Sequence, residues 1–496
     1  MFARVIRDTA AIATTLPSPG VVAAVLVAAL AAIAALSLLM RRRPEAFPLL
    51  AIGALPFRLP ISTGGRTVNL LIPLYLVVAA GTLTFLVPKW LGRGVDDSHD
   101  VADGGNRREQ QGIGARSEID GTTGRQAHRS PTKINTWLSP RGLEWLLFGA
   151  VVLYAVQGVY STDHAKAAEN VAFFYIPFGL LFILLRDVRW TRELVLACLG
   201  VAVALAVAFA GVGFVEYYRK ALFLNPKVIA SDQYGNYFRV NSLFFDPNIY
   251  GRFLAIVMIA VTTLVLTHGS AACAPRRRRD VLIGAGVLAW LLAGLVTSFS
   301  QSSIAALLLG MAVLAAYRWD VRATVYAAGA LVAIAAVLVL TAPPSLHLGL
   351  NGSGGSTSNA TSGRTKLISG GLELFAARPL YGYGSGSFET EYKRHGRASS
   401  ANATSASHTI PVTVAAEQGI IGLAVYVALL ITAFAVLFTG AGRSPPRIAL
   451  AACFAALVLH TWTYADFLED PITWALLGIG VALARAGNRL QACSPT

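Results

Sequence analysis

The sequence predicts an all-α integral membrane protein with about 12 or 13 membrane-spanning helices. Of its 496 residues, 55% are hydrophobic and only 14% are charged, whereas a soluble domain carries about 25% charged residues. The mean hydropathy is +0.58. Apolar stretches of roughly 20 residues, the length that crosses a bilayer as a helix, recur along nearly the whole chain. Residues 1–496 are therefore expected to form a single polytopic membrane domain.

Each apolar stretch is a candidate span, and the segment 46–60 is the doubtful one because proline interrupts it. This segment decides between 12 and 13 spans. In chain order the candidate spans cover residues 20–40, 46–60, 68–87, 142–160, 169–186, 193–213, 249–268, 281–299, 301–317, 322–341, 410–439, 447–465 and 471–485.

The basic residues between the spans set the orientation. From residue 88 onward the Arg-rich connections all fall on one side of the membrane, and the positive-inside rule makes that side the cytoplasm. The C-terminus is then inside. The net charge of +15 is explained by these topology anchors, including the run Arg276–Arg279, so we expect no nucleic-acid partner.

Three long connections lie between the spans. Residues 88–141 are polar and Gly-rich and are expected to form a disordered cytoplasmic loop. Residues 214–248 and 342–409 should face outward as two outer loops. The second is basic, which favours an anionic partner; its charged residues are Arg364, Lys366, Arg378, Lys393, Arg394 and Arg397 against Glu373, Glu389 and Glu391.

A histidine and a glutamate lie near the start of the apolar run 410–439. Pro411 suits the first turn of a helix, so His408 lies at or just before a helix N-terminus on the outer face. The helix dipole disfavours imidazolium there, which makes His408 either a neutral general base or an ordinary polar residue at a helix start. Glu417 lies nine residues further along, about two and a half turns into the predicted helix, and should face a polar cavity or an ion-pair partner rather than lipid.

The outer loops also hold arginines. Arg239 precedes Asp246-Pro247-Asn248, which read as a turn into the next helix. Arg364 opens an amphipathic stretch that could lie along the membrane surface. The glycines of GYGSGSF at 382–388 indicate flexible backbone near a ligand. Arginine grips phosphate through two parallel hydrogen bonds, so Arg239, Arg364 and His408 together suggest transfer from a phosphorylated membrane donor, with Arg378 and Glu417 as supporting residues.

Other polar residues in and between the spans are less informative. His460 is expected to face the helix bundle. The acidic turn of Asp466, Glu469 and Asp470 could hold a cation, but a solvated loop is the simpler interpretation. The spacing of Cys198, Cys273, Cys453 and Cys493 fits neither a zinc site nor a redox pair, so we expect no metal.

The segments RVNSLFFDPNIYG, SGRTKLISGGLELFAARPLYGYGSGSF and SHTIPVTVAAEQGIIG resemble the O-antigen ligase and O-antigen polymerase superfamily, and the resemblance covers roughly residues 140–485. It implies a GT-C-like bacterial inner-membrane glycosyltransferase that takes glycan from undecaprenyl pyrophosphate on the periplasmic side. Arg239 and Arg364 would bind the pyrophosphate, and His408 would activate the acceptor hydroxyl. The family commonly carries His-Asn at the base position, where this chain has His408-Thr409.

The resemblance implies an inverting, metal-independent reaction without cofactors, whose partners are the lipid-linked glycan, a glycan or glycolipid acceptor and membrane lipid. Ligase and polymerase activity differ only in the acceptor, and both stay open. The alternative is a transporter or flippase for a glycolipid or small anion, which predicts charges at mid-membrane and paired broken helices. A third interpretation is a noncatalytic partner in polysaccharide assembly.

Overall fold

The computed structural model describes residues 19–63, 66–92, 136–223, 238–268, 275–319, 321–322, 324, 357–396 and 409–492. Within these residues the fold is helical apart from one antiparallel hairpin of β1 (Leu59–Thr63) and β2 (Arg66–Leu70). The helices are α2 (Pro19–Arg42), α3 (Ala46–Ala54), α4 (Ile72–Gly81), α5 (Val87–Trp90), α6 (Pro140–Gly158), α7 (His164–Asn170), α8 (Ile176–Asp187), α9 (Arg192–Arg219), α11 (Pro247–His268), α12 (Pro275–Thr297), α13 (Gln301–Arg318), α15 (Thr357–Ala377), α16 (Phe388–Arg394), α17 (Ile410–Phe438), α18 (Pro445–Thr463) and α19 (Pro471–Ala492).

Nine helices among the described residues are long and apolar enough to cross a membrane. Each coincides with a span predicted from the sequence, which confirms an all-α polytopic membrane protein. Two of the nine are joined from pieces by π-helical turns, at Thr82–Leu86 between α4 and α5 and at Val171–Tyr175 between α7 and α8. Helix α6, with 19 residues, and the shorter apolar helix Pro471–Gly487 match the predicted spans 142–160 and 471–485.

The doubtful segment 46–60 is not a spanning helix. Helix α3 has nine residues, about 14 Å at 1.5 Å per residue, and Pro56 and Pro60 follow it where the chain turns into β1. The predicted span 68–87 begins instead at Ile72, because residues 66–70 form β2. The predicted span 322–341 lies almost wholly outside the described residues.

The predicted loops 88–141, 214–248 and 342–409 are described only in part. Residues 93–135 of the first, 224–237 of the second and 342–356 and 397–408 of the third lie outside the described residues. Helix α9 extends to Arg219, and the third loop contains α15 and α16.

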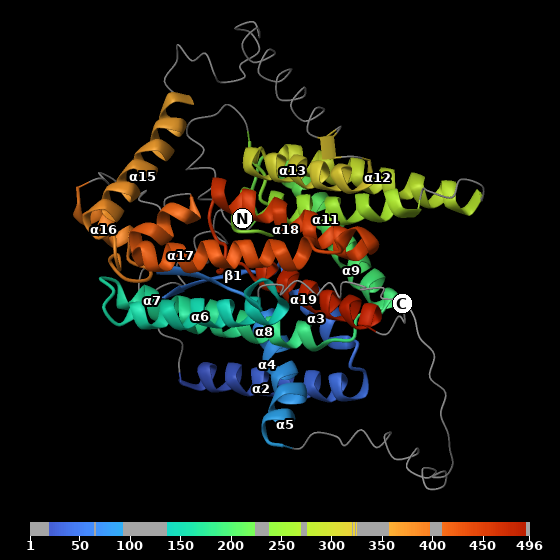
Figure 1. Ribbon diagram of the computed structural model, residues 1–496, viewed down its shortest axis with the longest axis horizontal. Helices are drawn as coiled ribbons and strands as arrows, with labels where there is room; N and C mark the ends of the chain where they lie inside the picture. Colours follow the sequence, from blue (N-terminus) through green and yellow to red (C-terminus); the bar gives the residue numbers. More distant parts are fainter. Residues whose placement is uncertain are drawn as a thin grey trace, which may run out of the picture.

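The long helices lie side by side, and the two ends of the bundle differ (Figure 1). Helices α15 and α16 lie at one end, together with the start of α17, and the end of α19 lies at the other. At the second end, Glu144 of α6 pairs with Arg186 of α8 at 3.0 Å and with Arg485 of α19, while Lys89 pairs with Asp187 at 3.0 Å. The basic ends of these helices therefore share one side, as the charge distribution predicts.

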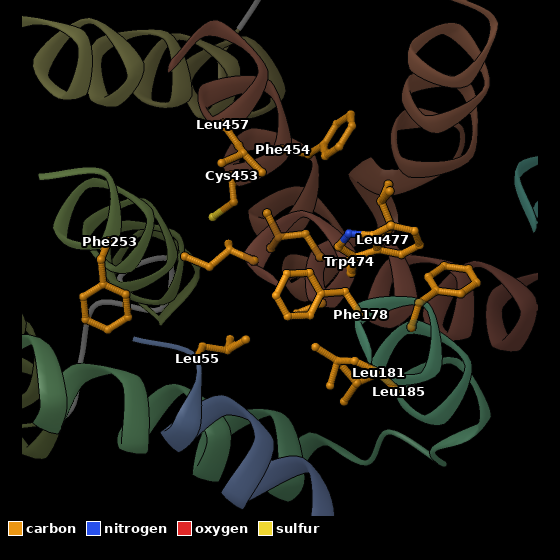
Figure 2. Packing of buried hydrophobic residues seen from close by; sticks show 14 of the residues in the cluster. Leu55, Phe178, Leu181, Leu185, Phe253, Cys453, Phe454, Leu457, Trp474 and Leu477 are labelled. Carbon is orange, nitrogen blue, oxygen red and sulfur yellow. The ribbon is translucent and has the colours of Figure 1, made fainter. Parts of the chain in front are cut away.

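The core of the bundle is built from large apolar side chains of helices distant in sequence (Figure 2). Trp474 of α19 is 1% exposed, and its indole N–H donates to the carbonyl oxygen of Leu468 at 2.8 Å. The same core includes buried side chains of α8, α11, α18 and the residue after α3, among them Phe178, Leu181, Phe253, Phe454, Leu457 and Leu55.

A buried ion pair fixes the turn between α18 and α19. Arg252 of α11 contacts Asp470 at 2.6 Å, and both side chains are 1% exposed. Arg252 also donates to the carbonyl oxygen of Ala465 at 3.3 Å, and Arg58 approaches Asp470 at 4.0 Å. The expectation of a solvated acidic turn is therefore wrong for Asp470, because the buried guanidinium of Arg252 compensates its charge.

Removing one member of this pair leaves a buried charge without its partner, so Asp470→Asn is expected to destabilise the protein by about 3–5 kcal/mol. Thermal unfolding of the detergent-solubilised protein measures the effect. The control is Asp187→Asn, which removes a surface pair with Lys89 and should cost about 0–1 kcal/mol. Equal melting temperatures for the two variants would contradict a stabilising role for the buried pair.

Candidate functional site

The structure describes only some of the residues predicted for the site. His408 lies outside the described residues and directly precedes Thr409 in the sequence. The backbone of Arg364 belongs to α15, but its side chain also lies outside the described part. Arg239, Arg378 and Glu417 are described in full. The meeting of Arg239, Arg364 and His408 in one pocket therefore stays a prediction.

Arg239 lies where α11, α12 and α13 meet. Its Nε donates to the carbonyl oxygen of Ser298 at 3.2 Å, and its Nη2 donates to Oδ1 of Asn248 at 3.3 Å. Ser300 Oγ donates to the same Asn248 oxygen at 2.8 Å. Asp246 caps the start of α11 by accepting from the backbone N–H of Asn248 at 2.7 Å, so the predicted turn into this helix is confirmed.

A buried polar network continues from this point into the bundle. Ser300 Oγ lies 2.7 Å from Ser303 Oγ, which lies 3.1 Å from Nε2 of His460. Ser302 Oγ lies 3.3 Å from the same ring nitrogen. His460 is 0% exposed, which confirms that it faces the interior of the bundle. Hydrogen bonds between α13 and α18 thus support the ends of the helices that hold Arg239.

Helix α17 breaks at Gly419, which has φ +66° and ψ −163° inside an otherwise helical run. A β-carbon there would lie 2.4 Å from the carbonyl oxygen of Leu380, so only glycine fits. The backbone groups around the break bond to other segments. Tyr383 N donates to Ala416 O at 3.3 Å, Gly384 N to Glu417 O at 2.8 Å, Ile420 N to Pro379 O at 2.7 Å, and Gln157 Nε2 to Gln418 O at 3.2 Å.

Glu417 fastens residues 382–388, the glycine loop, to this break. Its Oε2 accepts the backbone N–H of Gly386 at 2.8 Å, and its Oε1 accepts that of Phe388 at 3.0 Å. The side chain is 7% exposed. The predicted polar surroundings of Glu417 are confirmed, while the expectation of a flexible glycine loop is wrong, because backbone hydrogen bonds hold it on both sides.

Arg378 lies at the start of the same connection and is exposed. Its guanidinium stacks on the ring of Tyr383, 4.5 Å from the centroid. This cation–π contact places Arg378 against the outer surface of the connection.

A cavity of about 80 Å³ lies beside the break in α17. Its wall combines apolar side chains with two carboxyl groups, three phenols, a hydroxyl and an amide, which come from α6, the α7–α8 junction, α17 and the turn after α18. The polar lining residues are Glu417, Glu469, Tyr154, Tyr175, Tyr426, Thr413 and Gln418. A mostly apolar hollow with a few converging polar groups is the usual form of a ligand site.

Glu469 lines the cavity, but it was not assigned to the site from the sequence. Asn170 Nδ2 donates to its Oε1 at 2.9 Å. Burial, together with the charge of Asp466, raises the pKa of Glu469 to about 7 against the lowering effect of Lys166 and Arg58. Its place in the acidic turn was visible in the sequence, but the contribution of Tyr154 and Tyr175 was not, because each lies within an apolar run.

In the described ranges, no group of three or more His, Cys, Asp and Glu side chains has the arrangement to hold a metal ion.

The raised pKa of Glu469 predicts how stability depends on pH. An unfolded glutamate has a pKa of about 4.3, so the folded protein holds this proton more tightly. The resulting stabilisation is fully present below about pH 4 and is lost as pH rises through about 7. Glu469→Gln should therefore show a smaller decrease in melting temperature between pH 5 and 8 than the wild type. If the melting temperatures of the wild type and of Glu469→Gln changed in parallel with pH, Glu469 would be excluded as the titrating group.

Comparison with known proteins identifies part of the chain. No curated protein matches it. Residues 286–427 match the family described as Wzy_C, O-antigen ligase. The matched range begins within α12 and ends in α17 after the break at Gly419, so it contains Arg364, His408, the glycine loop and Glu417, but neither Arg239 nor Glu469. Residues 286–427 are thus similar to the O-antigen ligase family, and the apolar helices among the described residues indicate a multi-pass membrane protein.

Proposed function

We propose that the protein is a glycosyltransferase that moves a glycan from an undecaprenyl-pyrophosphate donor to an acceptor hydroxyl. The observation that carries the proposal is the family match over residues 286–427, which contains Arg364, His408 and Glu417. The nine apolar helices suit a donor that is anchored in the bilayer by a polyprenyl tail. The acceptor is a glycan or a glycolipid, which corresponds to polymerase or ligase activity.

In this proposal Arg239 and Arg364 bind the donor pyrophosphate. A guanidinium stays charged at any working pH and offers parallel donors to phosphate oxygens. The hydrogen bonds of Arg239 to Ser298 and Asn248 support the assignment, because they hold its side chain at the ends of three helices. Arg252 lies in α11, which begins eight residues after Arg239, and it contacts the turn before α19. Arg239 and the cavity therefore belong to the same end of the bundle.

His408 acts as the base. The acceptor oxygen forms a bond to the anomeric carbon while the bond from that carbon to the pyrophosphate oxygen breaks, and the configuration inverts. The hydroxyl proton passes to the imidazole, which the nearby helix N-terminus keeps neutral. The arginines offset the charge that develops on the leaving pyrophosphate.

The site faces the periplasm of a bacterial inner membrane in this proposal. The charge distribution supports it, because the basic helix ends lie opposite α15 and α16 and the positive-inside rule assigns basic ends to the cytoplasm.

The break in α17 and the buried Glu417 bear on the alternative of a transporter. In transporters, the backbone groups freed by a broken helix coordinate the substrate or its coupling ion. Around Gly419 these groups instead bond to residues 379–384 and to Gln157. The broken helix therefore serves the protein's own packing, which favours the transferase.

The role of His408 is tested by His408→Ala, which is expected to reduce transfer by about 10²–10⁴-fold, the usual contribution of a general base. Purified protein, undecaprenyl-pyrophosphate glycan and candidate acceptors form the assay, and donor binding is measured in parallel and should persist. His395→Ala is the matched control, since the ring of His395 bonds to the carbonyl oxygen of Glu391 on α16 at 2.9 Å. Full activity of the His408 variant would support a noncatalytic role.

Arg239→Ala is expected to weaken donor binding by about ten- to a hundredfold, because a hydrogen bond to a charged group contributes about 1.5–3 kcal/mol. Arg239→Lys keeps the charge but loses the paired donors, so its affinity for the donor should lie between those of the wild type and Arg239→Ala. Arg394→Ala removes an exposed guanidinium of the same outer region, whose side chain is 59% exposed, and should leave binding unchanged. If Arg239→Ala and Arg394→Ala lost donor affinity equally, the loss would come from the lower overall positive charge and not from a direct contact of Arg239 with the donor.

A further inference from the structure

Glu417 is buried beside the cavity, yet the transfer chemistry described above gives it no step. Both carboxylate oxygens accept backbone N–H groups of the glycine loop, at 2.8 and 3.0 Å. The glycine loop therefore bonds to the Glu417 side chain at the same place where the loop's own backbone N–H groups bond to the break in α17.

The opposite side of the glycine loop is fixed to the turn between α6 and α7. Ser161 Oγ donates to the carbonyl oxygen of Ser385 at 2.8 Å, and Ser385 Oγ donates to that of Tyr154 at 2.9 Å. Gly384 has φ +95°, and a β-carbon on it would lie 2.3 Å from Cα of Ser161. The glycine loop is thus packed between α17 on one side and α6 with the turn after it on the other, and hydrogen bonds hold it on both sides.

This loop ends the connection from α15, which packs along α17. A β-carbon on Gly371 of α15 would lie 2.5 Å from Cγ1 of Val412 of α17. In the sequence, Arg364 lies seven residues before Gly371, and α17 begins two residues after His408. Whatever fixes α15 against α17 therefore sets the relative position of the segments that carry both proposed site residues.

We propose that Glu417 is a positioning residue of the transferase. Its carboxylate holds the glycine loop on the break of α17 and so fixes helix α15 against the first turns of α17. This inference rests on the proposed function for its consequence in catalysis, while the mechanical part concerns the contact between the two helices alone.

A role of Glu417 in proton transfer makes different predictions from a positioning role. A proton-transferring carboxyl cannot be replaced by an amide, so Glu417→Gln would be as inactive as Glu417→Ala, and the pH–rate profile would change. A positioning carboxylate needs only acceptor atoms. Glutamine supplies an acceptor for one of the two N–H groups, so Glu417→Gln should retain part of the function.

Steady-state kinetics across pH test this distinction. Glu417→Ala is expected to lower kcat by on the order of tenfold or more, since small displacements of reacting groups cost that much, with a smaller change in the donor KM. Glu417→Gln should recover a substantial part of kcat, and the pH–rate profiles should keep the wild-type shape. Glu389→Ala, which removes an exposed carboxylate paired with Lys393, is the control and should behave as wild type. Identical inactivation by Ala and Gln would overturn the proposal.

A reversible crosslink tests the mechanical part without relying on activity. The pair Gly371→Cys and Val412→Cys, placed in a background without the native cysteines, should form a disulfide rapidly when Glu417 is present. Adding Glu417→Ala, or independently Gly384→Ala, should slow crosslinking several-fold because α15 is released from α17. Unchanged crosslinking rates in both variants would overturn the positioning role.

The same crosslink should rescue catalysis. With Glu417→Ala in place, oxidation of the cysteine pair is expected to restore most of kcat, and reductant should remove the gain. Rescue would be absent if Glu417 transferred a proton. Failure of the transferase proposal is distinguishable, because a protein without transfer activity in its wild-type form would still show the dependence of crosslinking on Glu417.

Discussion

The fold depends on one constraint, which is that every backbone polar group inside an apolar medium needs a hydrogen-bond partner within the protein. Helix α17 interrupts its own ladder at Gly419, and each freed group must be bonded from elsewhere. Residues 379–384 supply these partners, together with the side-chain amide of Gln157. The break therefore requires the connection from α15, and the connection requires the break. This mutual dependence brings the outer segment of the chain into the helix bundle.

The polar groups of the bundle follow from the same constraint. Burying a charge is costly unless a partner compensates it, and Arg252 with Asp470 meets that condition at 2.6 Å. The pair holds the turn after α18 against α11, which places Glu469 on the cavity wall. The network of Ser300, Ser303 and His460 performs a similar task near Arg239. Glu469 and Arg239 thus rest on polar contacts that lie inside the bundle.

Much of the helical frame could be predicted, because apolar stretches of membrane length and prolines at helix starts are local signals. The starts of α11 at Pro247 and of α17 at Ile410 agree with the sequence. The hairpin β1–β2 was missed because its strands lie between two apolar stretches and overlap the ends of the predicted spans 46–60 and 68–87. The glycine loop was interpreted as flexible because its restraints come from Ser161 and Glu417, which are distant in sequence. Tyr154 and Tyr175 gave no signal, because an aromatic residue in an apolar run usually faces lipid or core.

The chemistry of Glu417 also explains why a carboxylate, rather than an amide, suits this position. The glycine loop turns two N–H groups toward one point, and an ionised carboxylate offers an acceptor atom to each. An amide at the same place would turn its own donor toward one of them. The second N–H belongs to Phe388, the first residue of α16, where unbonded donors and the helix dipole favour negative charge. The carboxyl group that the sequence places in an apolar helix therefore acts as the link between two segments of the outer region.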